Sequence, residues 1–111
     1  MYTYNIKEIV RVIDGDTVDA IIDLGFNVHI KERIRLYGIN TPETRTRNKE
    51  EKKRGLIAKE KVKHILYSAK NIKLESKGLG KYGRVLGILI IDNQEQSLND
   101  FWLKNGYAVE M

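Results

Sequence analysis

A chain of 111 residues has room for one domain with a single modest hydrophobic core, and we take residues 1–111 as that domain. Apolar residues make up 41% of the sequence, which excludes a disordered chain, and the absence of cysteine excludes disulfides and thiolate metal sites. The net charge of +5 favours a polyanionic partner such as nucleic acid or an anionic membrane, although many soluble domains are equally basic. We find no secretory leader and no apolar run of membrane-spanning length, so we expect a soluble protein, either cytosolic or a mature form whose leader was removed.

The first third of the chain predicts three strands joined by short turns. A strand over residues 10–13 stops at Asp14-Gly15, a strong hairpin signal, and apolar residues then recur at every second position over residues 17–24. After a second turn, residues 29–37 alternate again, with apolar side chains on one face of the strand. The opposite, polar face of this third strand carries the basic residues Lys31, Arg33 and Arg35.

The pattern then changes to a helical period. Apolar residues at helical spacing predict a helix over about residues 49–67, with Asn48 as its N-cap. Two further strands follow over residues 72–75 and 85–91, and Ser97 then caps a short helix that we expect to bury Trp102. Five short strands with a helix between the third and fourth and another after the fifth suit a closed Greek-key barrel of the oligonucleotide-binding (OB) type, because an open sheet would leave two exposed edges.

Three polar segments lie at the ends of the predicted strands. Asp16 follows the first turn and is either part of an ordinary hairpin or a hard oxygen ligand for a metal. Arg35 ends the third strand and Glu43 lies in the loop beyond it; each is either a plain surface charge or part of a site, and the planar fork of arginine matches a phosphate. Tyr82 and Arg84 belong to a third segment, which is either a charged loop or a surface where Tyr82 stacks on a base.

Taken together, the three segments supply every group that phosphodiester hydrolysis requires. A bound metal neutralises phosphate charge and positions a water molecule. Glu43 can accept a proton from that water, and Arg35 and Arg84 can stabilise the charge that builds on the phosphate oxygens.

These motifs resemble those of the staphylococcal nuclease (thermonuclease) family. The resemblance is carried by Ile13-Asp14-Gly15-Asp16-Thr17-Val18, by Arg35 leading to Thr41-Pro42-Glu43, and by Lys81-Tyr82-Gly83-Arg84. The motifs appear in the family's order and near its spacing, within a similarity that runs from about Ile6 to Ala108. The resemblance implies an OB-fold barrel with packed helices and a Ca²⁺-dependent endonuclease that hydrolyses DNA and RNA and leaves 3′-phosphates.

The resemblance also implies a role for individual residues. Asp16 and Asn40 match the metal ligands, and Thr41 matches a residue that offers its backbone carbonyl to the metal. Glu43 matches the general base and Arg35 and Arg84 match the phosphate-binding arginines, while Lys81 and Tyr82 match residues near the nucleotide phosphate.

Two departures keep a second function open. Asn40 is neutral where the best-known member has aspartate, and the family's two active-site tyrosines and C-terminal helix have no counterpart in the sequence. The alternative is a module of the same fold that binds single-stranded nucleic acid with little or no catalysis. We expect single strands to be preferred in either case, because a shallow rim reaches a flexible backbone more easily than a duplex. The sequence leaves open whether DNA or RNA is the substrate and whether the protein is a monomer or a homodimer.

Overall fold

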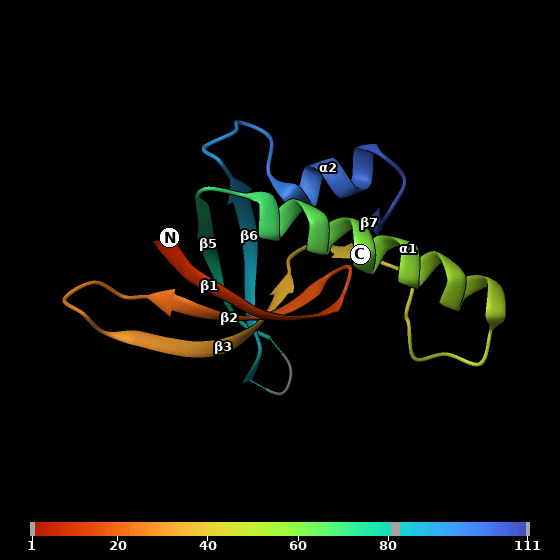
Figure 1. Cartoon of the computed structure of the whole chain (residues 1–111), viewed down its shortest axis with the longest axis horizontal. Coiled ribbons are helices and arrows are strands. Elements are labelled where there is room, and N and C mark those ends of the chain that lie inside the picture. Colours follow the sequence, from red (N-terminus) through yellow and green to blue (C-terminus); the bar gives the residue numbers. More distant parts are fainter. Residues whose placement is uncertain (1, 81–82, 111) are drawn as a thin grey trace.

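The computed structural model describes residues 2–80 and 83–110. Within them, five strands close into a barrel with the order β1-β2-β3-β6-β5, and two short strands, β4 and β7, pair beside it (Figure 1). The helix α1 follows β4, and α2 follows β6. The element bounds are β1 Thr3–Asp14, β2 Thr17–Asp23, β3 His29–Leu36, β4 Ile39–Asn40, α1 Lys49–Ser68, β5 Ile72–Leu79, β6 Val85–Ile91, α2 Leu98–Lys104 and β7 Val109–Glu110. The predicted five-stranded OB-type barrel with two helices is confirmed.

Strand β1 is longer than predicted and helps to close the barrel. It pairs with β2 along most of its length and with β5 through Thr3, Tyr4 and Asn5. Three register shifts interrupt its pairing with β2, and such irregularities bend a strand around a barrel. The N-terminal residues belong to the barrel, because Tyr4 pairs with Leu74 and the Tyr2 carbonyl accepts a hydrogen bond from Ser76 N at 2.8 Å.

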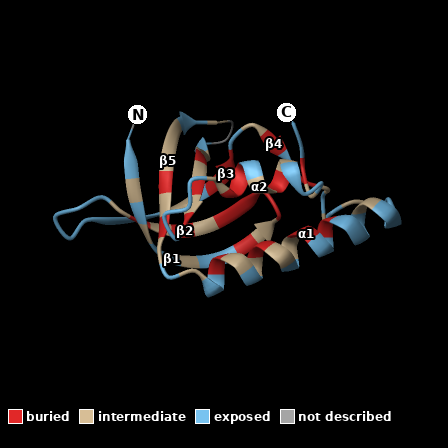
Figure 2. Ribbon diagram, turned by 90° about the horizontal axis from the view of Figure 1, so that it is seen from above, coloured by how far each residue is buried: buried red, intermediate tan, exposed pale blue. Residues whose placement is uncertain are grey.

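The two helices cover the barrel as their sequence patterns predict. Asn48 caps α1, with its side chain accepting a hydrogen bond from Glu51 N at 3.0 Å, and Ser97 caps α2 by accepting one from Asp100 N at 3.1 Å. One face of α1 is buried against the barrel and the opposite face is exposed (Figure 2). In α2, Trp102 is fully buried, as predicted, and its Nε1 donates to the Gly15 carbonyl at 2.7 Å. This bond fixes α2 against the turn between β1 and β2.

The small β4–β7 sheet was not predicted. Ile39 pairs with Glu110 and Asn40 with Val109, so the end of the described chain returns to the segment just after β3. Neither helix in the described part of the chain is long and apolar enough to cross a membrane.

Candidate active site

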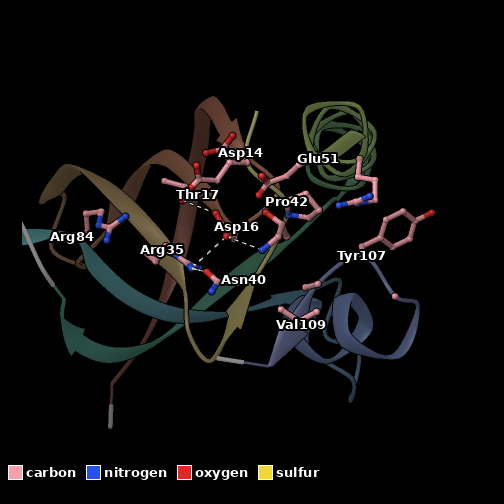
Figure 3. Close-up of a pocket in the computed structure, with 15 residues that line it drawn as sticks. Asp14, Asp16, Thr17, Arg35, Asn40, Pro42, Glu51, Arg84, Tyr107 and Val109 are labelled. Carbon is pink, nitrogen blue, oxygen red and sulfur yellow. Dashed lines mark hydrogen bonds and ion pairs between the residues drawn. The ribbon is translucent and has the colours of Figure 1, made fainter. Parts of the chain in front are cut away.

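A cleft of about 530 Å³ opens at one rim of the barrel (Figure 3). Its walls are the β1–β2 turn, the end of β3, the segment of residues 40–43, the first turns of α1 and the segment of residues 106–109. Six of the eight predicted site residues line it, namely Asp16, Arg35, Asn40, Thr41, Glu43 and Arg84. The other two, Lys81 and Tyr82, lie outside the described residues.

Asp16 is held in one orientation at the floor of the cleft. Its Oδ1 accepts a hydrogen bond from the Thr17 hydroxyl at 2.9 Å, and its Oδ2 accepts one from the Thr41 backbone N–H at 3.0 Å. Its backbone carbonyl also accepts from Leu36 N at 2.8 Å. Asp16 is buried, and burial of a carboxylate is costly unless hydrogen bonds compensate for the lost water. Its position is therefore fixed by these donors, unlike that of a solvated turn residue.

The β1–β2 turn needs Gly15 because two other elements approach it closely. A Cβ atom at this position would lie 3.0 Å from the Cβ of Ala58 on α1 and 3.0 Å from the Cγ2 of Thr41. The Asp-Gly hairpin signal therefore also brings α1 and the segment after β4 up to Asp16.

Arg35 differs from the sequence expectation. The alternation along β3 placed it on an outward polar face, but it is only 8% exposed. Its Nη1 donates to the Leu36 carbonyl at 2.9 Å, and its Nη2 donates to the Asn40 side-chain oxygen and lies 3.4 Å from Asp16 Oδ2. The outward face is covered here because the chain after β3 turns back across the end of the strand.

Asn40 and Thr41 complete the oxygen groups around Asp16. The Asn40 amide oxygen accepts from Arg35, and the Thr41 hydroxyl is buried with no hydrogen-bond partner among the described residues. Within the described residues, no three His, Cys, Asp or Glu side chains cluster to hold a metal ion. The donor set of Asp16, Asn40 and Thr41 consists of hard oxygens, which fit Ca²⁺ or Mg²⁺ rather than Zn²⁺. Because Arg35 engages two of the same oxygens, such a cation would compete with its guanidinium.

Glu43 lies on a loop that rests on α1. A Cβ atom at Gly55 would approach the Glu43 carbonyl oxygen to 2.7 Å and the Pro42 carbonyl oxygen to 2.8 Å. Next along the chain, the Thr44 hydroxyl donates to the Asp14 carboxylate. The loop is therefore tethered to the barrel and to the helix, while the Glu43 side chain stays exposed at the cleft.

Four further cleft residues, Asp14, Glu51, Arg54 and Tyr107, were not predicted as catalytic or metal-binding. Arg54 does end the basic run of residues 45–54, which could be either a solvated loop and helix start or a surface for contacts with the nucleic-acid backbone. Glu51 and Arg54 are three residues apart on α1, on the side next to buried Gly55 and Ala58. The helical spacing could therefore have placed both residues beside the buried face of α1. Asp14 belongs to the first motif but was assigned no role. Tyr107 follows α2, and no local pattern connects it with the cleft. The acids Asp14, Asp16, Glu43 and Glu51 thus share the cleft with Arg35, Arg54 and Arg84.

Two comparisons with known proteins found a match. A family model described as staphylococcal nuclease homologue matches residues 33–111, which is more than half of the chain. Protein ParB of Escherichia coli is 32% identical over 85 residues. The match covers 77% of this chain and 41% of that protein, so the chain spans about two fifths of the length of the relative that it matches.

Proposed function

The chain belongs to the family of staphylococcal nuclease homologues, and from this premise we propose that it is a Ca²⁺-dependent nuclease that hydrolyses phosphodiester bonds of DNA or RNA and leaves 3′-phosphates. The observation that carries the proposal is the meeting of Asp16, Glu43, Arg35 and Arg84 at one cleft. These residues come from four separate segments of the chain, and their meeting depends on the barrel.

The two arginines suit the binding of one phosphate from two directions. Arg35 is fixed at the end of β3 by its bond to the Leu36 carbonyl, and Arg84 precedes β6, the strand that pairs with β3 in parallel. A guanidinium donates two parallel hydrogen bonds to phosphate oxygens, and a donor held in place before the reaction stabilises the charge that develops on them.

Glu43 is the group that we assign to proton transfer. It is an exposed carboxylate at the cleft on a tethered loop, so it can take the proton of a water molecule that attacks phosphorus. Attack breaks the bond from phosphorus to the 5′-oxygen, and the phosphate stays on the 3′ side. The leaving 5′-oxygen takes a proton from solvent water at the open cleft, and Glu43 later returns its own proton to solvent. Ca²⁺, held by Asp16, Asn40 and the Thr41 carbonyl, would supply positive charge beside the phosphate.

A binding module without catalysis is the second candidate, and one observation favours it. Arg35 occupies the oxygen of Asn40 and lies against Asp16, the two side chains assigned to the metal, and Asn40 brings no charge of its own. A site of this kind can bind a phosphate through its arginines without holding a cation.

The experiment that separates the two candidates uses the unmodified protein and a short single-stranded DNA. We expect hydrolysis with millimolar Ca²⁺, products that end in a 3′-phosphate, and loss of activity when a chelator is added. Binding of the same DNA in chelator is measured in parallel. Binding without hydrolysis at any Ca²⁺ concentration would identify a binding module instead.

A further inference from the structure

The cleft continues beyond the Asp16–Arg35 pair toward α1 and the end of α2. Arg84 lies on one side of that pair and Tyr107 on the other (Figure 3). The same cleft is also lined by Arg54 of α1 and by the β7 residue Val109. The residues assigned so far to phosphate binding and hydrolysis leave the Tyr107 side of the cleft without a role.

The ring of Tyr107 is held firmly relative to Asp16. Gly106, with φ 75°, ends α2 in the left-handed conformation, and Tyr107 N then donates to the Trp102 carbonyl at 3.0 Å. The Tyr107 ring packs against the Trp102 ring, with 4.9 Å between their centroids. Because Trp102 Nε1 donates a hydrogen bond to the Gly15 carbonyl, next to Asp16, the aromatic pair is anchored to the β1–β2 turn. Tyr107 itself is half-buried and lines the cleft.

Arg54 lines the same cleft from α1. It precedes Gly55, whose close approach to the Pro42 and Glu43 carbonyls sets this turn of α1 against the active-site loop. Among the described residues, no carboxylate lies within ion-pair distance of Arg54. Glu51, one turn earlier, lines the same wall and is an acceptor suited to the amino groups of a base rather than to a phosphate.

We propose that Arg54 and Tyr107 form a second nucleotide subsite, which binds the nucleotide next to the one held at Arg35 and Arg84. Tyr107 stacks on its base and Arg54 contacts its phosphate. An aromatic ring stacks on any base, so this contact adds affinity without selecting a sequence. The inference rests on the proposed function, and it makes the preferred ligand a chain of at least two nucleotides rather than a mononucleotide.

The test compares two probes in chelator, thymidine 3′,5′-bisphosphate and a five-residue oligothymidylate. Arg54→Ala should weaken binding of the oligonucleotide, leave binding of the bisphosphate unchanged, and reduce the salt slope of oligonucleotide binding by about 0.7, the value for one phosphate contact on a single strand. Lys53→Ala is the matched control, because it removes the same charge from a neighbouring residue that does not line the cleft.

Tyr107→Leu should weaken oligonucleotide binding roughly 5- to 150-fold, the range for loss of one base-stacking contact. Tyr107→Phe, which keeps the ring, should bind like the unmodified protein, and thermal unfolding of both variants checks that the packing on Trp102 survives. The subsite is refuted if Arg54→Ala binds the oligonucleotide as Lys53→Ala does, or if Tyr107→Leu binds it as Tyr107→Phe does. If the unmodified protein binds neither probe and cuts no DNA, the proposed function fails together with the subsite.

Discussion

Two aspartate–arginine pairs lie close together at β2 and β3, one on the outer surface of the sheet and one at the cleft. Their arginines are two residues apart on β3 and their aspartates are three residues apart in the chain. Asp19 of β2 faces Arg33 of β3, and Arg33 donates two hydrogen bonds to its carboxylate, at 2.8 and 3.2 Å. Asp16, in the turn before β2, lies 3.4 Å from Arg35 of β3. The pairs differ in exposure through their arginines: the Arg33 side chain is 48% exposed and that of Arg35 is 10% exposed, whereas the aspartates are both largely buried, Asp19 at 14% and Asp16 at 10%.

The difference between the pairs supports our assignment of the buried pair to the proposed site. In the exposed pair, each partner satisfies the other with good geometry, as is usual for a contact that joins two strands. In the buried pair, both partners are oriented by other groups, Asp16 by Thr17 and Thr41 and Arg35 by Leu36 and Asn40. Buried charges that a network positions are held in place for a phosphate. A cation at Asp16 and Asn40 would have to displace the Arg35 guanidinium from their oxygens.

Replacement of each arginine by lysine should give the largest contrast. Arg35→Lys is expected to lower Ca²⁺-dependent turnover about 10²–10³-fold, because an ammonium group cannot replace the two-pronged contact of a guanidinium with phosphate. Arg33→Lys should leave turnover nearly unchanged. Equal turnover of the two variants on single-stranded DNA would remove the functional distinction between the pairs.

The chain after β3 covers the Asp16–Arg35 pair but not the Asp19–Arg33 pair. Gly55→Ala tests the role of this covering segment, because α1 packs against its continuation at Pro42 and Glu43. The new methyl group would meet the Pro42 and Glu43 backbone, so the loop beside Asn40 and Thr41 must move. We expect an overpacking cost of about 1–3 kcal/mol, which exceeds the gain of about 1 kcal/mol in helix propensity. Turnover should fall by up to about 10²-fold, because Glu43 is displaced.

Lys53→Ala, on an exposed position of the same helix, is the control for Gly55→Ala. Chemical denaturation gives the stability of both variants, and turnover is measured on the same preparations. A Gly55→Ala protein as stable and as active as the control would mean that the loop does not need the close approach of α1.

The smallest effect is expected at the exposed pair. The Arg33 hydrogen bond holds the pKa of Asp19 below its ordinary value near 3.8, against the opposing effect of partial burial. The pair therefore stabilises the fold above that ordinary value, and this stabilisation is lost as the pH falls through the depressed pKa of folded Asp19. Asp19→Asn should cost about 0.5–1 kcal/mol at neutral pH and progressively less in acid. Denaturation curves at several pH values check this, and a difference that does not depend on pH would contradict it.

The sequence predicted features that depend on local patterns. The buried stripe of α1, the Asn48 and Ser97 caps and the burial of Trp102 follow from spacing and side-chain type, and the structure confirms them. The convergence of the three motifs at one rim followed from their position at strand ends, together with the family resemblance. A barrel brings such ends together whatever their separation in the chain.

The sequence did not predict features that depend on distant segments. Arg35 has the same alternation signal as Arg33, and it is buried because residues 38–41 cover the end of β3. The first part of β1 is strand because β5 pairs with it. Tyr107 lines the cleft because the chain returns through the two-residue strand β7, which is too short to show any periodicity.

The most direct test of the account is the comparison of Glu43→Gln with Glu50→Gln. Both residues are exposed glutamates near the start of α1, but Glu43 lines the cleft and Glu50 does not. If Glu43 takes the proton from the attacking water, its glutamine variant should keep nucleotide affinity and lose about 10²–10⁴-fold in Ca²⁺-dependent turnover, while Glu50→Gln stays near the unmodified rate. Equal turnover of the two variants would contradict the assignment of Glu43 as the base and, with it, the mechanism proposed for this cleft.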